Sequence, residues 1–149
     1  SIFRKVTTEL DGDISGVKDS VRATIILPKN VRDKIIPVLE KSGMFDRIKD
    51  QTPDKFAGYS GVLTNIKMKS GIFAEVQFNT EKMIFAKEKP VDAVRIIGQK
   101  RWDEIAKETG LQGGLGHEIY EKMRVLKSDS PEYKKLVKES ENYYKNFQK

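Results

Sequence analysis

The feature that most restricts the fold of this chain is a pair of strand-like segments joined by a very short loop. Residues 59–68 and 72–79 are rich in β-branched and aromatic side chains, and Lys69-Ser70-Gly71 separates them. A three-residue loop with Gly is typical of a β-hairpin, because Gly readily adopts the left-handed backbone conformation of such a turn. If Met68 pairs with Ile72, Asn65 faces Glu75. The sequence therefore predicts a central antiparallel hairpin over about residues 59–79.

Side chains alternate between the two faces of a strand, so this pairing also predicts what each face carries. One face receives apolar residues and is expected to form core: Ile72, Ala74, Val76 and Phe78. The other receives mainly polar residues: Tyr59, Asn65, Lys67, Glu75, Gln77 and Asn79. A carboxylate such as Glu75 near a core requires a metal ion or a cation as its partner. The alternative is that this face is simply exposed to water, as one face of an antiparallel sheet often is.

The remaining periodicities predict one further central strand, an edge strand and several helices. Residues 21–27 read as a strand that ends at Pro28, and residues 44–49 read as a short edge strand. Helices are expected over residues 1–9, 31–42, 81–87, 91–108, 115–126 and from 131 onward. We expect a single α/β (α+β) domain over residues 1–149, with a core at about 1–90. The C-terminal helical part, about 91–149, is expected to cover the sheet.

Composition narrows the chemistry that this chain can perform. The 149 residues include no Cys and one His, which excludes disulfides, zinc-thiolate sites, thiol nucleophiles and multi-histidine metal centres. The formal charge of +6 favours polyanionic partners such as nucleotides or RNA, although solubility alone could explain it. No apolar run approaches the length of a membrane-spanning helix, and we expect no membrane contact. Because the chain begins at Ser1, a removed leader or a larger parent protein remains open.

Three motifs, taken in order, resemble the synthetase domain of the RelA/SpoT family. The hairpin segments Gly58-Tyr59-Ser60-Gly61-Val62-Leu63-Thr64-Asn65 and Glu75-Val76-Gln77-Phe78-Asn79-Thr80 are similar to that family's Gly-Tyr-Arg-Ser-x-His and Glu-(Ile/Val)-Gln-(Ile/Val)-Arg-Thr strands. Upstream, the segment Asp19-Ser20-Val21-Arg22 resembles its Asp-x-x-x-x-Arg strand with a shorter spacing. The resemblance covers about residues 1–90.

The resemblance implies a nucleotidyltransferase-type mixed sheet that transfers the pyrophosphate of ATP to a ribose 3′-hydroxyl with the help of Mg²⁺. In that family the acceptor is GDP or GTP, and toxin relatives use adenine nucleotides or the 3′ end of tRNA. It implies that Asp19 and Glu75 hold Mg²⁺, and that Glu75 also assists deprotonation of the acceptor hydroxyl. The other implied site residues are a base-stacking Tyr59, a supporting Gln77, phosphate contacts from Arg22 or Lys5, and the nucleotide-binding Asn65 and Asn79.

The chain departs from the family pattern at three positions of the hairpin. Ser60, Leu63 and Asn79 stand where the family has Arg, His and Arg. One hypothesis is therefore a divergent enzyme with another acceptor, acting in the cytoplasm as the effector part of a larger secreted toxin. Such a toxin is expected to have a cognate acidic immunity protein. The alternative is a catalytically inactive basic module that binds nucleic acid or a protein partner on the same scaffold.

Three C-terminal features each allow two interpretations. The Gly-rich residues 112–116 predict a flexible joint or, less directly, a phosphate cradle at the start of a helix. His117 follows this segment and is either structural or in contact with substrate. Aromatic residues alternate with lysines over 133–147, a pattern that suits either a core stripe with a basic outer face or a surface that stacks on RNA bases.

Overall fold

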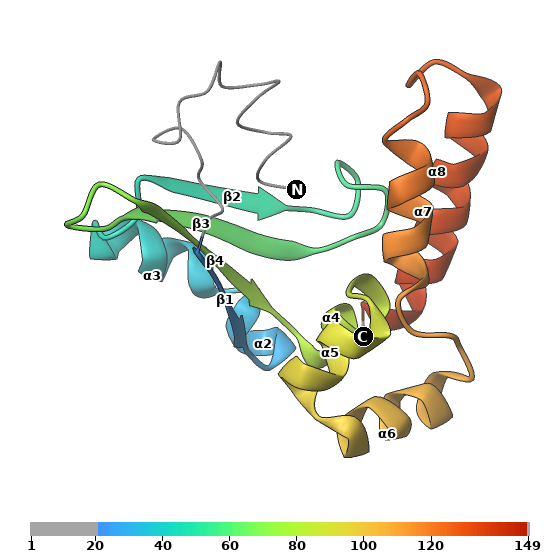
Figure 1. Cartoon of the computed structure of the whole chain (residues 1–149), viewed down its shortest axis with the longest axis horizontal. Helices are drawn as coiled ribbons and strands as arrows, with labels where there is room; N and C mark the ends of the chain where they lie inside the picture. Colours follow the sequence, from blue (N-terminus) through green and yellow to red (C-terminus); the bar gives the residue numbers. More distant parts are fainter. Residues whose placement is uncertain (1–20, 149) are drawn as a thin grey trace.

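The computed structural model describes residues 21–148, which form a four-stranded mixed sheet and a group of helices (Figure 1). The strands are β1 (Val21–Ile26), β2 (Arg47–Gln51), β3 (Gly61–Lys67) and β4 (Phe73–Asn79), in the spatial order β1-β4-β3-β2. β1 runs parallel to β4, and the other neighbours are antiparallel. The predicted α+β class is confirmed. The expected helix over residues 1–9, Lys5 and Asp19 lie outside the described residues.

The predicted hairpin and its register are confirmed. Asn65 pairs with Glu75, and the backbone N–H of Met68 donates to the carbonyl of Ile72 at 2.8 Å. Gly71 has a φ of 85°, the left-handed conformation that the turn requires. The edge strand is also present, but it begins three residues and ends two residues later than the sequence suggested, and it pairs with β3.

One face of the sheet is covered by the helical segment that follows β1. This segment is α2 (Lys29–Arg32) and α3 (Ile35–Ser42) rather than the single helix expected over residues 31–42. The break places Pro37 in the first turn of α3, where its missing N–H removes no helical hydrogen bond. Leu39 of α3 packs with Val62 and Phe78 of the sheet. The face predicted to be apolar is therefore the one that forms this core.

The helices after β4 are shorter than their periodicity suggested. They are α4 (Glu81–Lys87), α5 (Pro90–Ile97), α6 (Gln99–Thr109), α7 (Leu115–Met123) and α8 (Pro131–Tyr144), followed by the short 3₁₀ segment η2 (Lys145–Phe147). α4 spans the predicted residues 81–87, and Thr80 caps it by accepting a hydrogen bond from the N–H of Met83. The single helix expected over residues 91–108 is divided at Gly98, whose φ of 82° is incompatible with a continuous helix.

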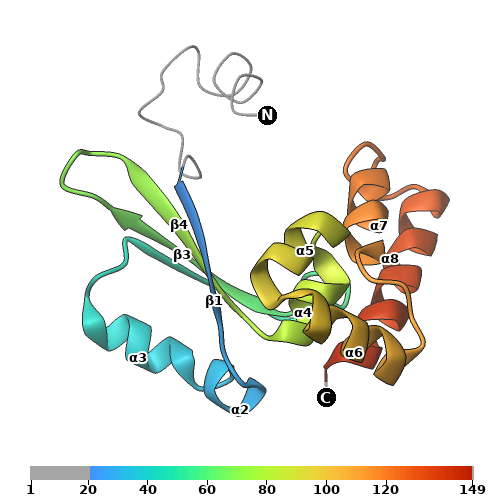
Figure 2. The same ribbon diagram turned by 60° about the horizontal axis from the view of Figure 1, so that its bottom comes forward.

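These C-terminal helices gather at one end of the sheet instead of lying across a face, which corrects the expectation that they cover it (Figure 1 and Figure 2). They meet the sheet at the segment before β3, where Ser140 and Gln148 donate hydrogen bonds to the carbonyls of Ala57 and Gly58. Three aromatic residues of α8 and η2, Tyr143, Tyr144 and Phe147, are at most 6% exposed and belong to the same core cluster as Phe85, whereas Tyr133 is half-buried. The aromatic stripe is therefore largely core, and these rings are not available to stack on RNA.

The glycines before and within α7 are sites of close packing rather than a flexible joint. A side chain at Gly113 would overlap the ring of Trp102, and one at Gly116 would overlap the hydroxyl of Tyr144. Across residues 21–148, the structure contains no helix with the length and apolar character needed to cross a membrane.

Candidate active site on the polar face of the sheet

The face of the sheet opposite α3 carries three rows of side chains that run across all four strands. The pairing aligns Arg22, Glu75, Asn65 and Arg47 in the first row. It aligns Thr24, Gln77, Leu63 and Lys49 in the second. In the third, Ile26 pairs with Asn79 and Gln51 pairs with Gly61, and the side chain of Asn79 lies beside Gly61. The sheet thus brings together Arg22, Asn65, Glu75, Gln77 and Asn79, five of the residues that the sequence singled out. Their roles stay predictions.

Glu75 is buried in the middle of this face and is held by two donors. Its side chain is 10% exposed, and its Oε1 atom lies 2.8 Å from Nε of Arg22 on the neighbouring strand. The same oxygen accepts a hydrogen bond of 3.0 Å from Nε2 of Gln77. A buried carboxylate with a charged partner and an amide donor is fixed as an acceptor in one orientation. The alternative interpretation, that this face is simply exposed to water, is therefore wrong for Glu75.

A lysine that the sequence analysis did not single out completes this network. Lys87, the last residue of α4, donates from Nζ to Oε1 of Gln77 at 2.9 Å. An ammonium group can only donate, so it requires the amide oxygen of Gln77 on its side and turns the NH₂ group toward Glu75. Burial alone would lower the pKa of Lys87, but Tyr59 and Glu88 outweigh it, and the pKa is raised. Lys87 thus remains a cation. The position lies in a helix, so no strand pattern could have revealed it.

Tyr59 lies at the junction between this face and the C-terminal helices. It is 8% exposed, and its hydroxyl accepts a hydrogen bond of 2.7 Å from Nδ2 of Asn79. Its ring packs against Tyr144, with 5.6 Å between the ring centroids, while Nζ of Lys87 lies 5.3 Å from the ring. Burial raises the pKa of Tyr59. In the structure Tyr59 therefore holds Asn79 in place, and its ring is largely covered by the protein.

Cations outnumber carboxylates on this face. Beside Arg22 and Lys87, strand β2 contributes Arg47 and Lys49, and the register places Lys67 of β3 on the same side. Within the three rows of the described strands, Glu75 is the single carboxylate. Sequence reasoning missed Arg47 and Lys49 because their face follows from the register of an edge strand whose boundaries were misplaced by two to three residues. Such a surface suits a polyanionic ligand.

A divalent metal ion fits this face if water and the phosphate oxygens of a substrate supply most of its ligands. Within residues 21–148, no three His, Asp or Glu side chains form a metal-binding group. Mg²⁺, however, commonly uses one or two carboxylates, several waters and the phosphate oxygens of its substrate. The buried Glu75 is suited to be one such ligand, and the second expected ligand, Asp19, lies outside the described residues.

Comparison with known proteins shows which proteins this chain resembles. No protein-family model matches the chain. A curated relative, the (p)ppApp synthetase toxin Tas1 of Pseudomonas aeruginosa (strain UCBPP-PA14), is 34% identical over 142 residues, which are 95% of this chain and 32% of the relative. The chain thus spans about a third of that protein's length.

A solved structure resembles the fold as a whole. It is the crystal structure of the complex between the type VI effector Tas1 and its immunity protein. The similarity has a TM-score of 0.87 at 32% identity, and it covers 99% of this chain and 75% of the matched chain. The mixed sheet with helices gathered at one end is thus an α+β fold that this chain shares with the matched structure. Within that fold class, the chain belongs to the Tas1 family.

Proposed function

We propose that this chain is the catalytic domain of a toxin that transfers the pyrophosphate of ATP to the 3′-hydroxyl of a nucleotide. The observation that carries the proposal is the buried Glu75, held by Arg22 and Gln77 on a face otherwise rich in cations. The similarity to Tas1, whose name describes a (p)ppApp synthetase toxin, supports an adenine nucleotide as the acceptor. The motif resemblance to RelA/SpoT synthetases supports the same reaction class.

In this reaction the acceptor 3′-oxygen forms a bond to the β-phosphorus of ATP. The bond between that phosphorus and the oxygen bridging to the α-phosphate breaks, and AMP leaves. Transfer of this type depends mainly on positioning and on stabilising negative charge. Glu75 would accept the proton of the acceptor hydroxyl, and Arg22, Arg47 and Lys49 would bind phosphate oxygens. Gln77 and Lys87 would keep Glu75 in one orientation.

Glu75 and Asp19 would hold a Mg²⁺ ion when it is bound. The ion would neutralise phosphate oxygens and orient the leaving group. We further propose an immunity protein as a partner, because the Tas1 crystal structure contains one. The cationic face favours an acidic inhibitor surface. The proposed place of action is the cytoplasm of a cell that receives the toxin.

The test is transfer of radioactive label from γ-³²P-ATP in the presence of Mg²⁺. ADP, ATP, GDP, GTP and bulk tRNA are offered separately to the chain and to its Glu75→Gln variant. We expect label in an adenine nucleotide, with release of AMP, and a loss of at least about a thousandfold in Glu75→Gln. The substitution preserves the size of the side chain, so circular dichroism and melting temperature are expected to change little.

A matched control is Glu104→Gln, which removes a largely exposed carboxylate on α6 and is expected to retain full activity. Label in GDP, GTP or tRNA instead would correct the acceptor and keep the reaction class. Absence of label in every acceptor, also with a chain extended at its N-terminus, would overturn the enzyme proposal. Nucleic-acid binding with steep salt dependence would then support the inactive basic module.

A further inference from the structure

A pocket of about 350 Å³ opens at the end of the sheet where β1 and β4 finish, away from Glu75. Its wall includes the residues that follow these parallel strands, Leu27 and Pro28 after β1 and Thr80 after β4. Thr80 lies five residues beyond Glu75, roughly 15 Å along the strand direction. Ligands in α/β sheets often bind outside the carboxyl ends of parallel strands. The pocket thus adjoins the third row of the polar face, with which it shares Ile26, but it lies away from the row that contains Glu75.

Arg32 is the unusual group in this pocket. The residue is 9% exposed, and within the described part of the chain its Nε atom is buried without any hydrogen-bond partner. Among residues 21–148, the guanidinium makes its polar contacts through Nη2, which lies 3.3 Å from Oγ of Ser60 and 2.9 Å from Oδ1 of Asp33. A buried cation with unused donors costs free energy, and a guanidinium fork is shaped to bind a phosphate or carboxylate.

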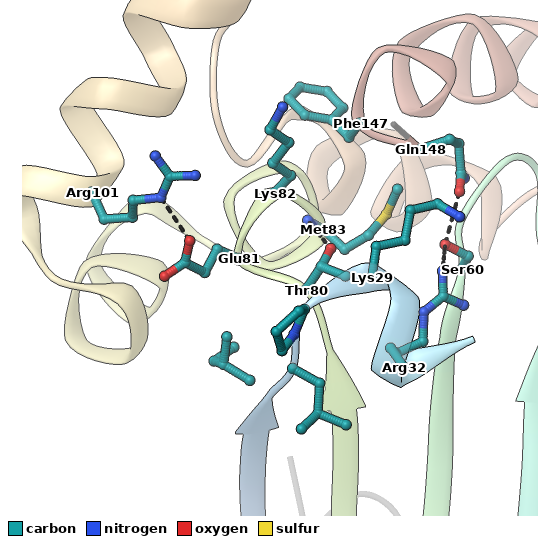
Figure 3. A pocket seen from close by; sticks show the side chains of 13 residues that line it. Lys29, Arg32, Ser60, Thr80, Glu81, Lys82, Met83, Arg101, Phe147 and Gln148 are labelled. Atoms are coloured by element: carbon teal, nitrogen blue, oxygen red, sulfur yellow. Dashed lines mark hydrogen bonds and ion pairs between the residues drawn. The ribbon is translucent and has the colours of Figure 1, made fainter. Parts of the chain in front are cut away.

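The charges around Arg32 leave an excess of positive charge. Asp33 is shared between Arg32 and Lys29, and the pocket's carboxylate Glu81 is taken up by Arg101 at 2.6 Å. Figure 3 shows Lys29, Arg32, Ser60 and Gln148 grouped on one side of the pocket and the Glu81–Arg101 pair on the other. The same four residues also line an adjoining hollow of about 330 Å³. An anion entering either hollow therefore meets the same guanidinium and ammonium groups, although the second hollow is also lined by the carboxylates of Asp33 and Asp50.

The pocket also has an apolar part. Ile26, Leu27 and Pro28, which are partly or fully exposed, contribute to its lining. Its volume lies at the lower end of the range of small-molecule sites. A free inorganic ion would leave this apolar surface unused, whereas a phosphorylated organic molecule would contact both parts.

We propose that this pocket is a second ligand site, which binds a small molecule carrying a phosphate group, of the size of a nucleotide. The phosphate contacts Arg32 and Lys29, and the organic part packs against Leu27 and Pro28. The site goes beyond the proposed transfer reaction and does not depend on it, because none of its residues is shared with the row that contains Glu75.

The test is a titration of the ¹⁵N-labelled chain, observed by NMR, without Mg²⁺. ADP, inorganic phosphate and adenosine are added separately to the wild type, Arg32→Gln, Lys29→Gln and the control Lys41→Gln, which alters an exposed lysine at the end of α3. With ADP we expect saturable shifts in residues 26–32 and 80–83. Affinity is expected to fall about tenfold in Arg32→Gln and several-fold in Lys29→Gln, and to stay unchanged in Lys41→Gln.

Inorganic phosphate is expected to shift the same signals with weaker affinity, and adenosine to leave them unchanged. Because Arg32 is buried, its variant could lose the fold, which its spectrum reveals, and Lys29→Gln then decides. ADP shifts confined to residues 62–77 or equal affinity of Lys29→Gln and wild type would overturn the proposal. Equal shifts with adenosine and ADP would also overturn it, because the phosphate would then contribute nothing.

Discussion

The two faces of the sheet are built from the same strands but exclude water in different ways. On the face under α3, Val62 and Phe78 are 2% and 6% exposed because apolar side chains pack on them. On the other face, Asn65, Gln77 and Asn79 are as little exposed, at 3%, 5% and 0%, although all three are polar.

The difference lies in what each face requires of its neighbours. An apolar core is satisfied by any side chain of suitable volume, because dispersion and hydrophobic contacts have no fixed direction. A buried polar group needs a partner of the right kind at the right angle. The polar face therefore fixes the positions and orientations of its groups, as binding a substrate requires, while the apolar face mainly supplies stability.

The largest effect on stability is expected from the apolar face. Phe78→Ala removes a ring that packs with Leu39, Val62 and Phe45, and it should lower the free energy of unfolding by about 3–5 kcal/mol. Urea unfolding followed by circular dichroism measures this change. A loss below about 1 kcal/mol would show that the face under α3 is not the main apolar core of the sheet.

Much of the contrast between the apolar and the polar face could be predicted from the sequence. The three-residue loop sets the register of the hairpin, and the register assigns Glu75, Gln77 and Asn79 to one face without any structure. These are local rules, because a turn and the alternation of side chains depend on neighbouring residues. The same locality allowed the end of one helix at residue 42 and the start of another at residue 81 to be predicted.

The features that the sequence did not reveal depend on distant contacts. The Arg22–Glu75 ion pair requires β1 to lie parallel to β4, and the link from Lys87 to Gln77 requires α4 to fold back beside the sheet. The glycines before α7 suggested flexibility, but their place beside Trp102 and Tyr144 is set by tertiary packing. Gly98 divided a helix that periodicity alone had joined.

On the polar face, a smaller loss of stability should follow from removing a partner. Asn79→Ala leaves the hydroxyl of Tyr59 and the backbone N–H of Thr80 without their bonds to the Asn79 side chain, at a cost of about 2 kcal/mol. The exposed Asn142→Ala is the control. A double-mutant cycle with Tyr59→Phe should show that the two losses are not additive. Additive losses would contradict the direct coupling of Asn79 to Tyr59.

Lys87 tests whether the polar face fixes orientation. Lys87→Met keeps most of the chain length but loses the donor to Gln77, and we expect kcat of the proposed reaction to fall about tenfold with KM nearly unchanged. Lys87→Arg should restore part of kcat, and the exposed Lys100→Met should have no effect. A rise in KM with an unchanged kcat would indicate that Lys87 binds substrate directly instead of positioning Gln77.

The smallest expected effect is on how the free energy of unfolding changes at alkaline pH, and it again differs between the two faces of the sheet. The pKa values of Tyr59, Tyr143 and Tyr144 are all raised by burial above the ordinary value of 10.0. Below pH 10 these tyrosines are protonated in both the folded and the unfolded chain, so their contribution to the free energy of unfolding is fully present. Above it the unfolded chain releases protons that the folded chain retains, and the free energy of unfolding falls as pH rises.

Tyr59→Phe removes one of these groups, so its stability should fall less steeply between pH 10 and 11, by at most about 1.4 kcal/mol per pH unit. Phe78→Leu on the apolar face removes no titrating group. It should therefore lower stability by a similar amount at every pH and leave the slope unchanged. Urea unfolding at several pH values measures both slopes. Equal slopes for Tyr59→Phe and the wild type would show that Tyr59 ionises as readily in the folded chain as in the unfolded one, and the polar face would then be open to water.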